Sequence, residues 1–351
     1  MSILALQLLF FIVTLLLTGC YRTLALKYAV LDRPVERSNH SSPIPVGGGL
    51  TIAIVFLAAS THYYFTGSLT QNQFLAILSA GFIALIGFAD DCFRLDIRWR
   101  IPGQIAASLW VVFCLGDLPA VNFLIFELNS QWLLKLCAIL SLLWLLNLYN
   151  FMDGIDGLAA GELLFVSVMS LLLVINVQDG VTALLSATLF TAAAGFLVWN
   201  WPPARIFMGD AGSSFIGFSL GVLALISIQQ GSLNLWTWVI LLGVFVTDAT
   251  VTLLRRVLNG DAWHQGHSTH AYQHAVRKYK SHGKVTITVV VLNFAWLAPM
   301  AWLSVLQPRF GLLWCLLALT PLLLIALRLG AGKQSGSKDG DDRSESDAAT
   351  A

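Results

Sequence analysis

Four groups of polar residues in this chain have types and spacings suited to phosphate chemistry. They are the pair Asp90 and Asp91, the segment 147–156, the segment 207–213, and the histidines His264, His267, His270 and His274. Two adjacent carboxylates repel each other unless cations neutralise them, so the aspartate pair indicates a metal–phosphate site or a general base. The alternative is a solvated helix end beside Arg94 and Arg98. That alternative has a cost, because carboxylates at a helix C-terminus oppose the helix dipole.

The segment 147–156 places polar groups at a regular interval. The side chains of Asn147, Asn150, Asp153 and Asp156 recur every three residues. On a helix end that runs into a turn they would line one face, and Gly154 would let the backbone approach a ligand closely. The alternative is that Asn and Asp only cap the helix. Four such groups exceed what a cap needs, so we favour a binding role.

The segment 207–213 combines an acid with the small residues of a helix start. Glycine and serine there expose backbone N–H groups, which cradle phosphates well. Asp210 beside such a cradle suits Mg²⁺, which binds few carboxylates and takes its other ligands from phosphate and water. Mn²⁺ is the alternative ion. Phe207 is placed to stack on a base, although a phenylalanine alone would more often belong to the core.

The histidines lie in a basic loop, 256–284, together with Arg277, Lys278, Lys280 and Lys284. No acid or cysteine completes a zinc site among them. Histidines beside basic residues suit a pyrophosphate better. A solvated basic loop attracted to anionic lipid is the competing explanation for the lysines.

The composition indicates that these polar groups belong to a membrane protein. The chain has 351 residues, of which 57% are hydrophobic and 11% charged, whereas soluble domains carry about a quarter charged residues. We expect an all-α polytopic membrane protein, a bundle of ten or eleven transmembrane helices with an active-site cleft at its cytoplasmic face. The expected spans are 2–27, 46–65, 72–89, 102–116, 131–149, 158–177, 181–199, 213–230, 234–255, 285–306 and 309–328. Membrane lipids are expected partners, and nucleic acid is not.

The distribution of basic residues predicts the orientation. With eleven spans, all four polar groups fall between spans on one side of the membrane, although the short span 102–116 is the weakest of the set. That side holds 18 of the 20 lysines and arginines, and only Lys135 and Arg309 fall near the other. The positive-inside rule makes the basic side cytoplasmic. We expect a membrane domain over 1–329 and a disordered cytoplasmic tail over 330–351.

Taken together, the motifs resemble those of the polyprenyl-phosphate N-acetylhexosamine-1-phosphate transferases, glycosyltransferase family 4. The resemblance covers about residues 30–285. It rests on the stretches 32–49, GFADD (87–91), NLYNFMDGIDGLA (147–159), NWPPARIFMGDAGSSFIG (200–217), Asp248 with Arg255, and HSTHAYQH (267–274). The first stretch and 199–217 most resemble the branch that initiates O-antigen. The histidine motif departs from the triple histidine of the MurNAc-pentapeptide enzymes, which argues against a peptidoglycan substrate.

The resemblance implies a reaction and roles for individual residues. An N-acetylaminosugar 1-phosphate (FucNAc, QuiNAc or GlcNAc type) would pass from a UDP-sugar to undecaprenyl phosphate in the bacterial inner membrane, releasing UMP. Asp210 resembles the Mg²⁺ ligand, and Asp90 the general base or lipid-phosphate positioner, with Asp91 beside it. The other matched positions are Asn147, Asn150, Asp153, Asp156, Asn200 and Phe207 near the nucleotide, Arg98, Arg100, His267 and His270 near phosphates, and Gly47 and Gly48 near the cleft. A homodimer is compatible with this family.

Two other classes of membrane protein remain open. An ion-coupled secondary transporter would place its carboxylates near the bilayer midplane, whereas most here lie at span ends. No internal repeat is apparent, which also counts against a transporter. A phosphatidyltransferase of the CDP-alcohol type would need an arginine soon after an Asp-Gly pair, and the stretch from Asp156 to Glu162 lacks it.

Overall fold

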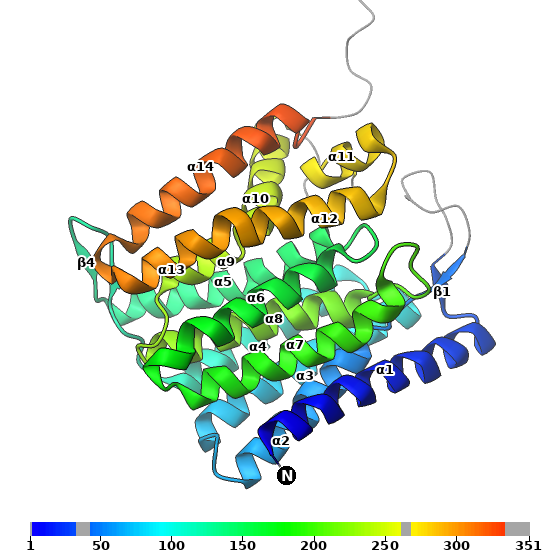
Figure 1. Ribbon diagram of the computed structural model, residues 1–351, viewed down its shortest axis with the longest axis horizontal. Coiled ribbons are helices and arrows are strands. Elements are labelled where there is room, and N and C mark those ends of the chain that lie inside the picture. Colours follow the sequence, from blue (N-terminus) through cyan, green and yellow to red (C-terminus); the bar gives the residue numbers. More distant parts are fainter. Residues whose placement is uncertain (1, 33–42, 261–267, 334–351) are drawn as a thin grey trace, which may run out of the picture.

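The computed structural model describes residues 2–32, 43–260 and 268–333, and this part of the chain is almost entirely helical (Figure 1). The long helices are α1 (Ile3–Lys27), α2 (Leu50–Phe65), α3 (Gln71–Phe93), α4 (Ile97–Leu115), α5 (Gln131–Met152), α6 (Leu158–Val174), α7 (Gly180–Asn200), α8 (Asp210–Gln229), α10 (Gly243–Leu258), α12 (His282–Leu292) and α14 (Gly311–Leu329). The shorter ones are α9 (Leu235–Leu241), α11 (Ala271–Tyr279), α13 (Ala298–Leu306), the 3₁₀ helices η1 (Ile175–Val177) and η3 (Pro308–Phe310), and the π-helix η2 (Asn293–Leu297). Two small antiparallel pairs join β1 (Leu31–Asp32) to β2 (Ile44–Pro45) and β3 (Val121–Asn122) to β4 (Glu127–Leu128).

Length and composition confirm an all-α, multi-pass membrane protein. Eight helices of the described chain are long and apolar enough to cross a membrane, or nine if a bent pair counts as one span. Each of the eleven spans expected from the sequence coincides with helix. Two of them, α2 and α4, are too short or too polar to pass the same test. Both still pack lengthwise in the bundle, α4 against α3 and α5 and α2 against α3 and α7.

The prediction of one continuous span over 234–255 is wrong, because this segment forms two helices. Helices α9 and α10 meet at Leu242 with a bend of 81°. In Figure 1, α10 runs crosswise to its neighbours. Hydropathy could not reveal the bend, because it records composition and not direction. The change of direction lets Asp248 and Arg256 on α10 be buried against other helices.

Helix α8 lies at the centre of the bundle, between α3 and α5. Small residues along it make this close packing feasible. A side chain at Gly221 would lie 2.7 Å from Leu142, and one at Gly217 would collide with the carbonyl of Leu145. The consequence is that the first turn of α8, with Asp210, sits inside the protein where α3 and α5 end.

The two ends of the bundle differ. One end carries β1, β2, α11 and the turns after α3, α5 and α7, and the opposite end carries the β3–β4 hairpin (Figure 1). The described members of all four polar groups found in the sequence lie at the first of these, hereafter the site end. The chain after α14 also docks there, because the N–H of Gly332 donates to the carbonyl of Thr269 (2.8 Å). The tail prediction beyond residue 333 lies outside the described residues.

Candidate active site

A polar cavity of about 670 Å³ opens at the site end. Residues from five separate segments line it, including Asp90, Asp91, Arg94, Arg100, Asn150, Asp153, Phe207 and Asp210. The structure therefore brings together residues that lie far apart in the sequence, from Leu31 to His282.

Asp210 is held at the first position of α8 by two partners. One carboxylate oxygen accepts from the side-chain amide of Asn150 (2.7 Å), and the other lies 3.3 Å from Arg100. Asn150 also donates to the hydroxyl of Ser213 (3.1 Å). A carboxylate in the first turn of a helix is favoured by the helix dipole. Asp210 is thus fixed where the helix field, an arginine and an amide converge.

Arg100 joins the two acidic helix ends. Its guanidinium lies 2.5 Å from Asp90 and also reaches Asp210. Of the arginines after the aspartate pair, Arg94 and Arg100 line the cavity. Arg98 is exposed and is not among the lining residues, and its backbone N–H is capped by Asp96 (2.9 Å). The structure therefore favours Arg100 over Arg98 as a phosphate contact.

Asp91 is used differently from Asp90. Its two oxygens accept from the backbone N–H groups of Asp210 (2.9 Å) and Ala211 (3.0 Å). Because the first N–H groups of a helix have no partner within it, Asp91 caps α8 from α3. A catalytic role for Asp91 stays a prediction.

Glycines allow the backbone to close around this cap. Gly209 has φ +75°, and a side chain there would lie 2.6 Å from the Asp91 carboxylate and 2.7 Å from the backbone of Gly47. Gly47 has φ +92°. The N–H of Gly48 donates to the carbonyl of Phe207 (2.9 Å). Gly47 and Gly48 therefore form the backbone wall beside the segment that leads into Asp210.

Not every residue of the 147–156 series faces the cavity. Asn150 and Asp153 line it, whereas Asn147 donates back to the carbonyl of Leu143 (2.7 Å). Asp156 accepts from the N–H of Ala204 (3.0 Å) and is not among the lining residues. The nucleotide contacts expected for Asn147 and Asp156 stay predictions.

Asn200 ties two loops together. It accepts from the N–H of Gly157 (3.0 Å) and donates to the carbonyl of Ile206 (3.0 Å). Asn200 is buried, and both the oxygen and the nitrogen of its amide form hydrogen bonds with backbone groups. A direct contact between Asn200 and a nucleotide also stays a prediction.

Several carboxylates lie close together in the cavity, so a bound cation would relieve their mutual repulsion. Burial, followed by the negative charges of Asp210, Asp91 and Asp156, raises the pKa of Asp153 well above its usual range. Among the described residues no three His, Cys, Asp or Glu side chains form a ready metal cluster. Mg²⁺ does not require one, since it uses one or two carboxylates together with phosphate oxygens and water. Asp210 is the carboxylate best placed for that arrangement.

The histidines of the basic loop separate into two groups. His264 and His267 lie outside the described residues. His270 is buried, with its Nδ1 3.3 Å from Asp248, and does not line the cavity. Asp248 also accepts from the N–H groups of Ala271 (2.8 Å) and Tyr272 (2.9 Å). Within the described chain, His270 therefore belongs to the anchor of α11, and its phosphate contact stays a prediction.

Gln273 and His282, to which the sequence analysis gave no role, also line the cavity. Gln273 lies on α11, and His282 is the first residue of α12. A signal for His282 was available, since it begins a span at the site end, after the N-cap Ser281.

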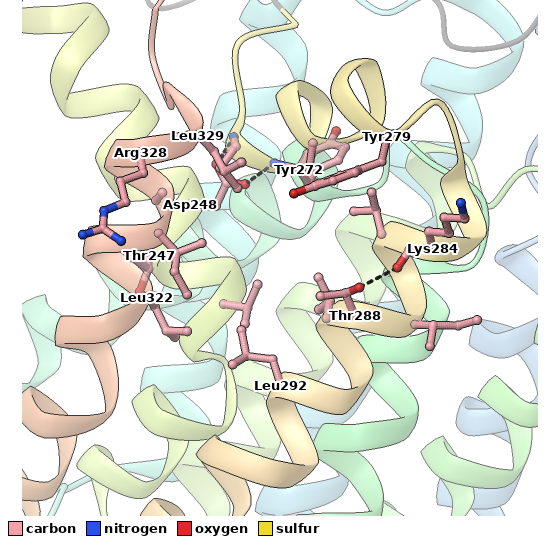
Figure 2. A pocket seen from close by; sticks show the side chains of 18 residues that line it. Thr247, Asp248, Tyr272, Tyr279, Lys284, Thr288, Leu292, Leu322, Arg328 and Leu329 are labelled. Carbon is pink, nitrogen blue, oxygen red and sulfur yellow. Dashed lines mark hydrogen bonds between the residues drawn. The ribbon is translucent and has the colours of Figure 1, made fainter.

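A second cavity, of about 660 Å³, lies between α10, α11, α12 and α14. Figure 2 shows apolar side chains such as Leu292 and Leu322 in it, with Lys284 and Arg328 on opposite sides. Tyr272 lines this cavity and its neighbour Gln273 lines the polar one. The hydroxyl of Tyr272 donates to the carbonyl of Phe151 (3.0 Å). Helix α11 therefore forms the partition between a polar and an apolar cavity.

Comparison with known proteins agrees with this arrangement. The family model described as glycosyl transferase family 4 matches residues 73–228. The chain is 30% identical over 288 residues to a probable undecaprenyl-phosphate N-acetylglucosaminyl 1-phosphate transferase of Bacillus subtilis, covering 80% of this chain and 79% of that protein. The chain belongs to glycosyl transferase family 4.

Other relatives have related names. The chain is 28% identical over 325 residues to a decaprenyl-phosphate N-acetylglucosaminephosphotransferase of Mycobacterium leprae, covering 83% of this chain and 80% of that one. It is 30% identical over 235 residues to a phospho-N-acetylmuramoyl-pentapeptide-transferase of Latilactobacillus sakei, covering 63% and 71%. The resemblance to this family drawn from the sequence motifs is confirmed, and the narrower resemblance to the branch that initiates O-antigen stays a prediction.

Proposed function

We propose that this protein transfers an N-acetylaminosugar 1-phosphate from a UDP-sugar to undecaprenyl phosphate, with release of UMP. The observation that carries the proposal is the pairing of the two cavities across α11. A water-soluble nucleotide sugar needs a polar cavity with cations, which Arg94 and Arg100 supply. A polyprenyl chain needs an apolar one that adjoins it.

The apolar cavity suits the acceptor. It is walled by membrane helices, and its polar surface is small, so a hydrocarbon chain can fill it. Lys284 lies in the first turn of α12, two residues after His282, which lines the polar cavity. A phosphate at the head of the chain would therefore pass close to basic groups on its way to the polar cavity.

The reaction is a single displacement at phosphorus. An oxygen of the acceptor phosphate forms a bond to the β-phosphorus of the donor. The bond from that phosphorus to the oxygen shared with the α-phosphate breaks, and its electrons leave with UMP. Arg100 is held by Asp90 and Asp210 so that it can offset the charge that develops on the phosphates.

Asp90 acts by positioning Arg100 and not by removing a proton. A phosphate monoester has its second pKa near about 6, so the acceptor is already largely a dianion at neutral pH. One oxygen of Asp90 is in addition occupied by Arg100. Substantial turnover by Asp90→Asn would support this role, and complete loss with Arg100 still in place would favour the general base.

Magnesium fits the donor set of the polar cavity. Asp210 would hold it, with Asn150 keeping that carboxylate oriented. When bound, the ion would neutralise charge on the pyrophosphate and so ease the departure of UMP. Asp90, Asp91 and Asp153 line the same cavity as Asp210, and this concentration of carboxylates favours a bound cation.

The side of the membrane and the donor sugar complete the proposal. The distribution of lysine and arginine supports a cytoplasmic site end, with the C-terminus on the same side. The O-antigen-like stretches favour UDP-FucNAc or UDP-QuiNAc as the donor. Two of the relatives are named for N-acetylglucosamine, so UDP-GlcNAc belongs in the first panel.

The test is release of UMP by the purified protein in detergent with undecaprenyl phosphate, Mg²⁺ and a panel of UDP-aminosugars. Asp210→Ala should abolish turnover. Asp117→Ala is the matched control, because Asp117 is exposed at the opposite end and pairs only with Lys135 (2.8 Å) among the described residues. Lipid-dependent UMP release that Asp210→Ala removes and Asp117→Ala keeps would support the transferase. Folded protein that releases no UMP, but moves ions or solutes across liposomes, would favour the transporter.

A further inference from the structure

His282 is a cavity residue to which neither the motifs nor the mechanism above gives a role. It is the first residue of α12 and lines the polar cavity, with 18% of its side chain exposed. Its Nδ1 lies 3.2 Å from a carboxylate oxygen of Asp156. The ring is therefore held from one side and open to the cavity on the other.

Asp156 is itself held firmly. Its second carboxylate oxygen accepts from the N–H of Ala204 (3.0 Å), and its carbonyl accepts from the hydroxyl of Thr286 (2.9 Å). Thr286 lies one turn after His282 on α12. These contacts fix the carboxylate and the helix relative to each other, so the orientation of the imidazole is fixed as well.

The second ring nitrogen is left for a ligand. Among the described residues the polar contacts of the His282 ring are made at Nδ1, and the ring is not sealed from solvent. In the neutral ring Nδ1 accepts from the backbone N–H of Asp156 (3.5 Å), and in the charged ring it donates to the Asp156 carboxylate; in both forms Nε2 carries hydrogen and can donate to an acceptor in the cavity. A carboxylate that fixes one nitrogen so that the other can act is a recurrent arrangement for histidine.

The distribution of charge indicates which acceptor this is. The two arginines that line the cavity, Arg94 and Arg100, both follow α3 in the sequence. Among the described lining residues, His282 is the only other side chain that can carry a positive charge, and it comes from α12. His270, expected at the pyrophosphate, is instead buried on Asp248. A diphosphate bound between these walls would meet cations on both sides.

We propose that Nε2 of His282 donates a hydrogen bond to the diphosphate of the UDP-sugar, and that Asp156 positions the ring for this contact. The inference rests on the proposed function and names a further binding residue for the donor. Asp156 then acts through His282, without touching the nucleotide.

Two substitutions separate ligand binding from a structural role. In His282→Gln the amide nitrogen takes the place of Nε2, so the contact with the ligand can persist. In His282→Asn the amide nitrogen takes the place of Nδ1, so the contact with Asp156 can persist while the ligand contact is lost. The matched controls are His62→Gln and His62→Asn, because His62 is exposed at the end of α2, away from the cavity.

The measurement is the Kd of UDP, and of the turned-over UDP-sugar, by titration calorimetry in detergent with Mg²⁺. Loss of a hydrogen bond to a charged group should weaken UDP binding about tenfold or more in His282→Asn. His282→Gln should bind UDP at least about fivefold more tightly than His282→Asn does, and the His62 variants should match wild type. A Gln variant no tighter than the Asn variant would overturn the proposal, as would a loss confined to the UDP-sugar, which would place the contact on the sugar.

The proposed function can fail separately. Turnover by the wild-type protein establishes the transferase whatever the His282 variants do. Wild-type protein that binds UDP but turns over no donor would contradict the transferase function. The His282 contact would then be tested by the binding measurements alone. Wild-type protein that does not bind UDP would overturn both.

Discussion

Two helices at the site end begin in the same way and serve different purposes. At the start of α8, the N–H groups of Asp210 and Ala211 donate to Asp91 from α3. At the start of α11, the N–H groups of Ala271 and Tyr272 donate to Asp248 from α10. In each case an aspartate of a neighbouring helix supplies the cap that the helix cannot provide for itself.

The surroundings of the two caps differ. Asp248 is 5% exposed and is enclosed by His270 and the hydroxyl of Thr252 (3.1 Å). Asp91 instead lines the polar cavity beside Asp90. Both caps fix the start of a helix, but only the start of α8 also places a carboxylate, that of Asp210, in an open cavity. The pair Asp90 and Asp91 therefore divides its work, since one holds Arg100 and the other holds α8.

Of the two caps, the α8 cap should have the larger effect on activity when it is removed. In Asp91→Ala two N–H groups lose their acceptor and Asp210 is free to shift. We expect turnover to fall by about a hundredfold or more, since misplacement by about 1 Å can cost that much. Asp91→Asn keeps one acceptor and should fall between this variant and wild type. Initial rates of UMP release measure both, and Asp91→Ala with more than a tenth of wild-type turnover would show that this cap does not position the site.

Removing the α11 cap should act mainly on stability. Asp248→Ala leaves two N–H groups and His270 without their buried partner, at a cost of about 3 kcal/mol. Thermal unfolding in detergent should show a clear loss, larger than that of Asp91→Ala. Equal losses of stability in the two variants would break the distinction drawn between the caps.

The tightness of the α8 cap can be tested at a glycine. Gly209→Ala requires an alanine at φ +75° and brings its side chain against the Asp91 carboxylate (2.6 Å). We expect a loss of about 2 kcal/mol or more, from strain and from displacement of the cap. Gly67→Ala is the matched control, with φ +78° and nothing within 4 Å, and should lose only about 1 kcal/mol. Similar melting temperatures for the two variants would mean that the capping carboxylate can move aside at little cost in stability.

The sequence predicted the helices and the gathering of the motifs, but not how the polar residues divide their roles. Hydropathy locates spans because every membrane helix must be apolar along its length. The same polar residue types serve as caps, loop ties and ligands, and only the partner distinguishes them. Asn200 holds two backbone groups, and the partners of Asp91 lie 119 and 120 residues away. No local spacing records such contacts, nor the 81° bend that brings Asp248 to α11.

The smallest expected difference between the two regions is their response to acid. The α11 region contains His274, whose pKa is lowered from 6.5 by burial and then by the charge of Arg277. A hydrogen bond to the backbone of Lys333 and the charge of Asp248 oppose this shift, and His270 adds to it. The unfolded chain therefore binds a proton more readily than the folded one, so stability present above about pH 6.5 is lost as the pH falls toward the lowered pKa. We expect the melting temperature of wild-type protein to fall between pH 7.5 and 5.5 by more than that of His274→Gln. Parallel curves for the two proteins would show that His274 does not cause the pH response, and the carboxylates around Asp153 would not explain it either, because burial raises the pKa of Asp153 and acid then favours the folded state.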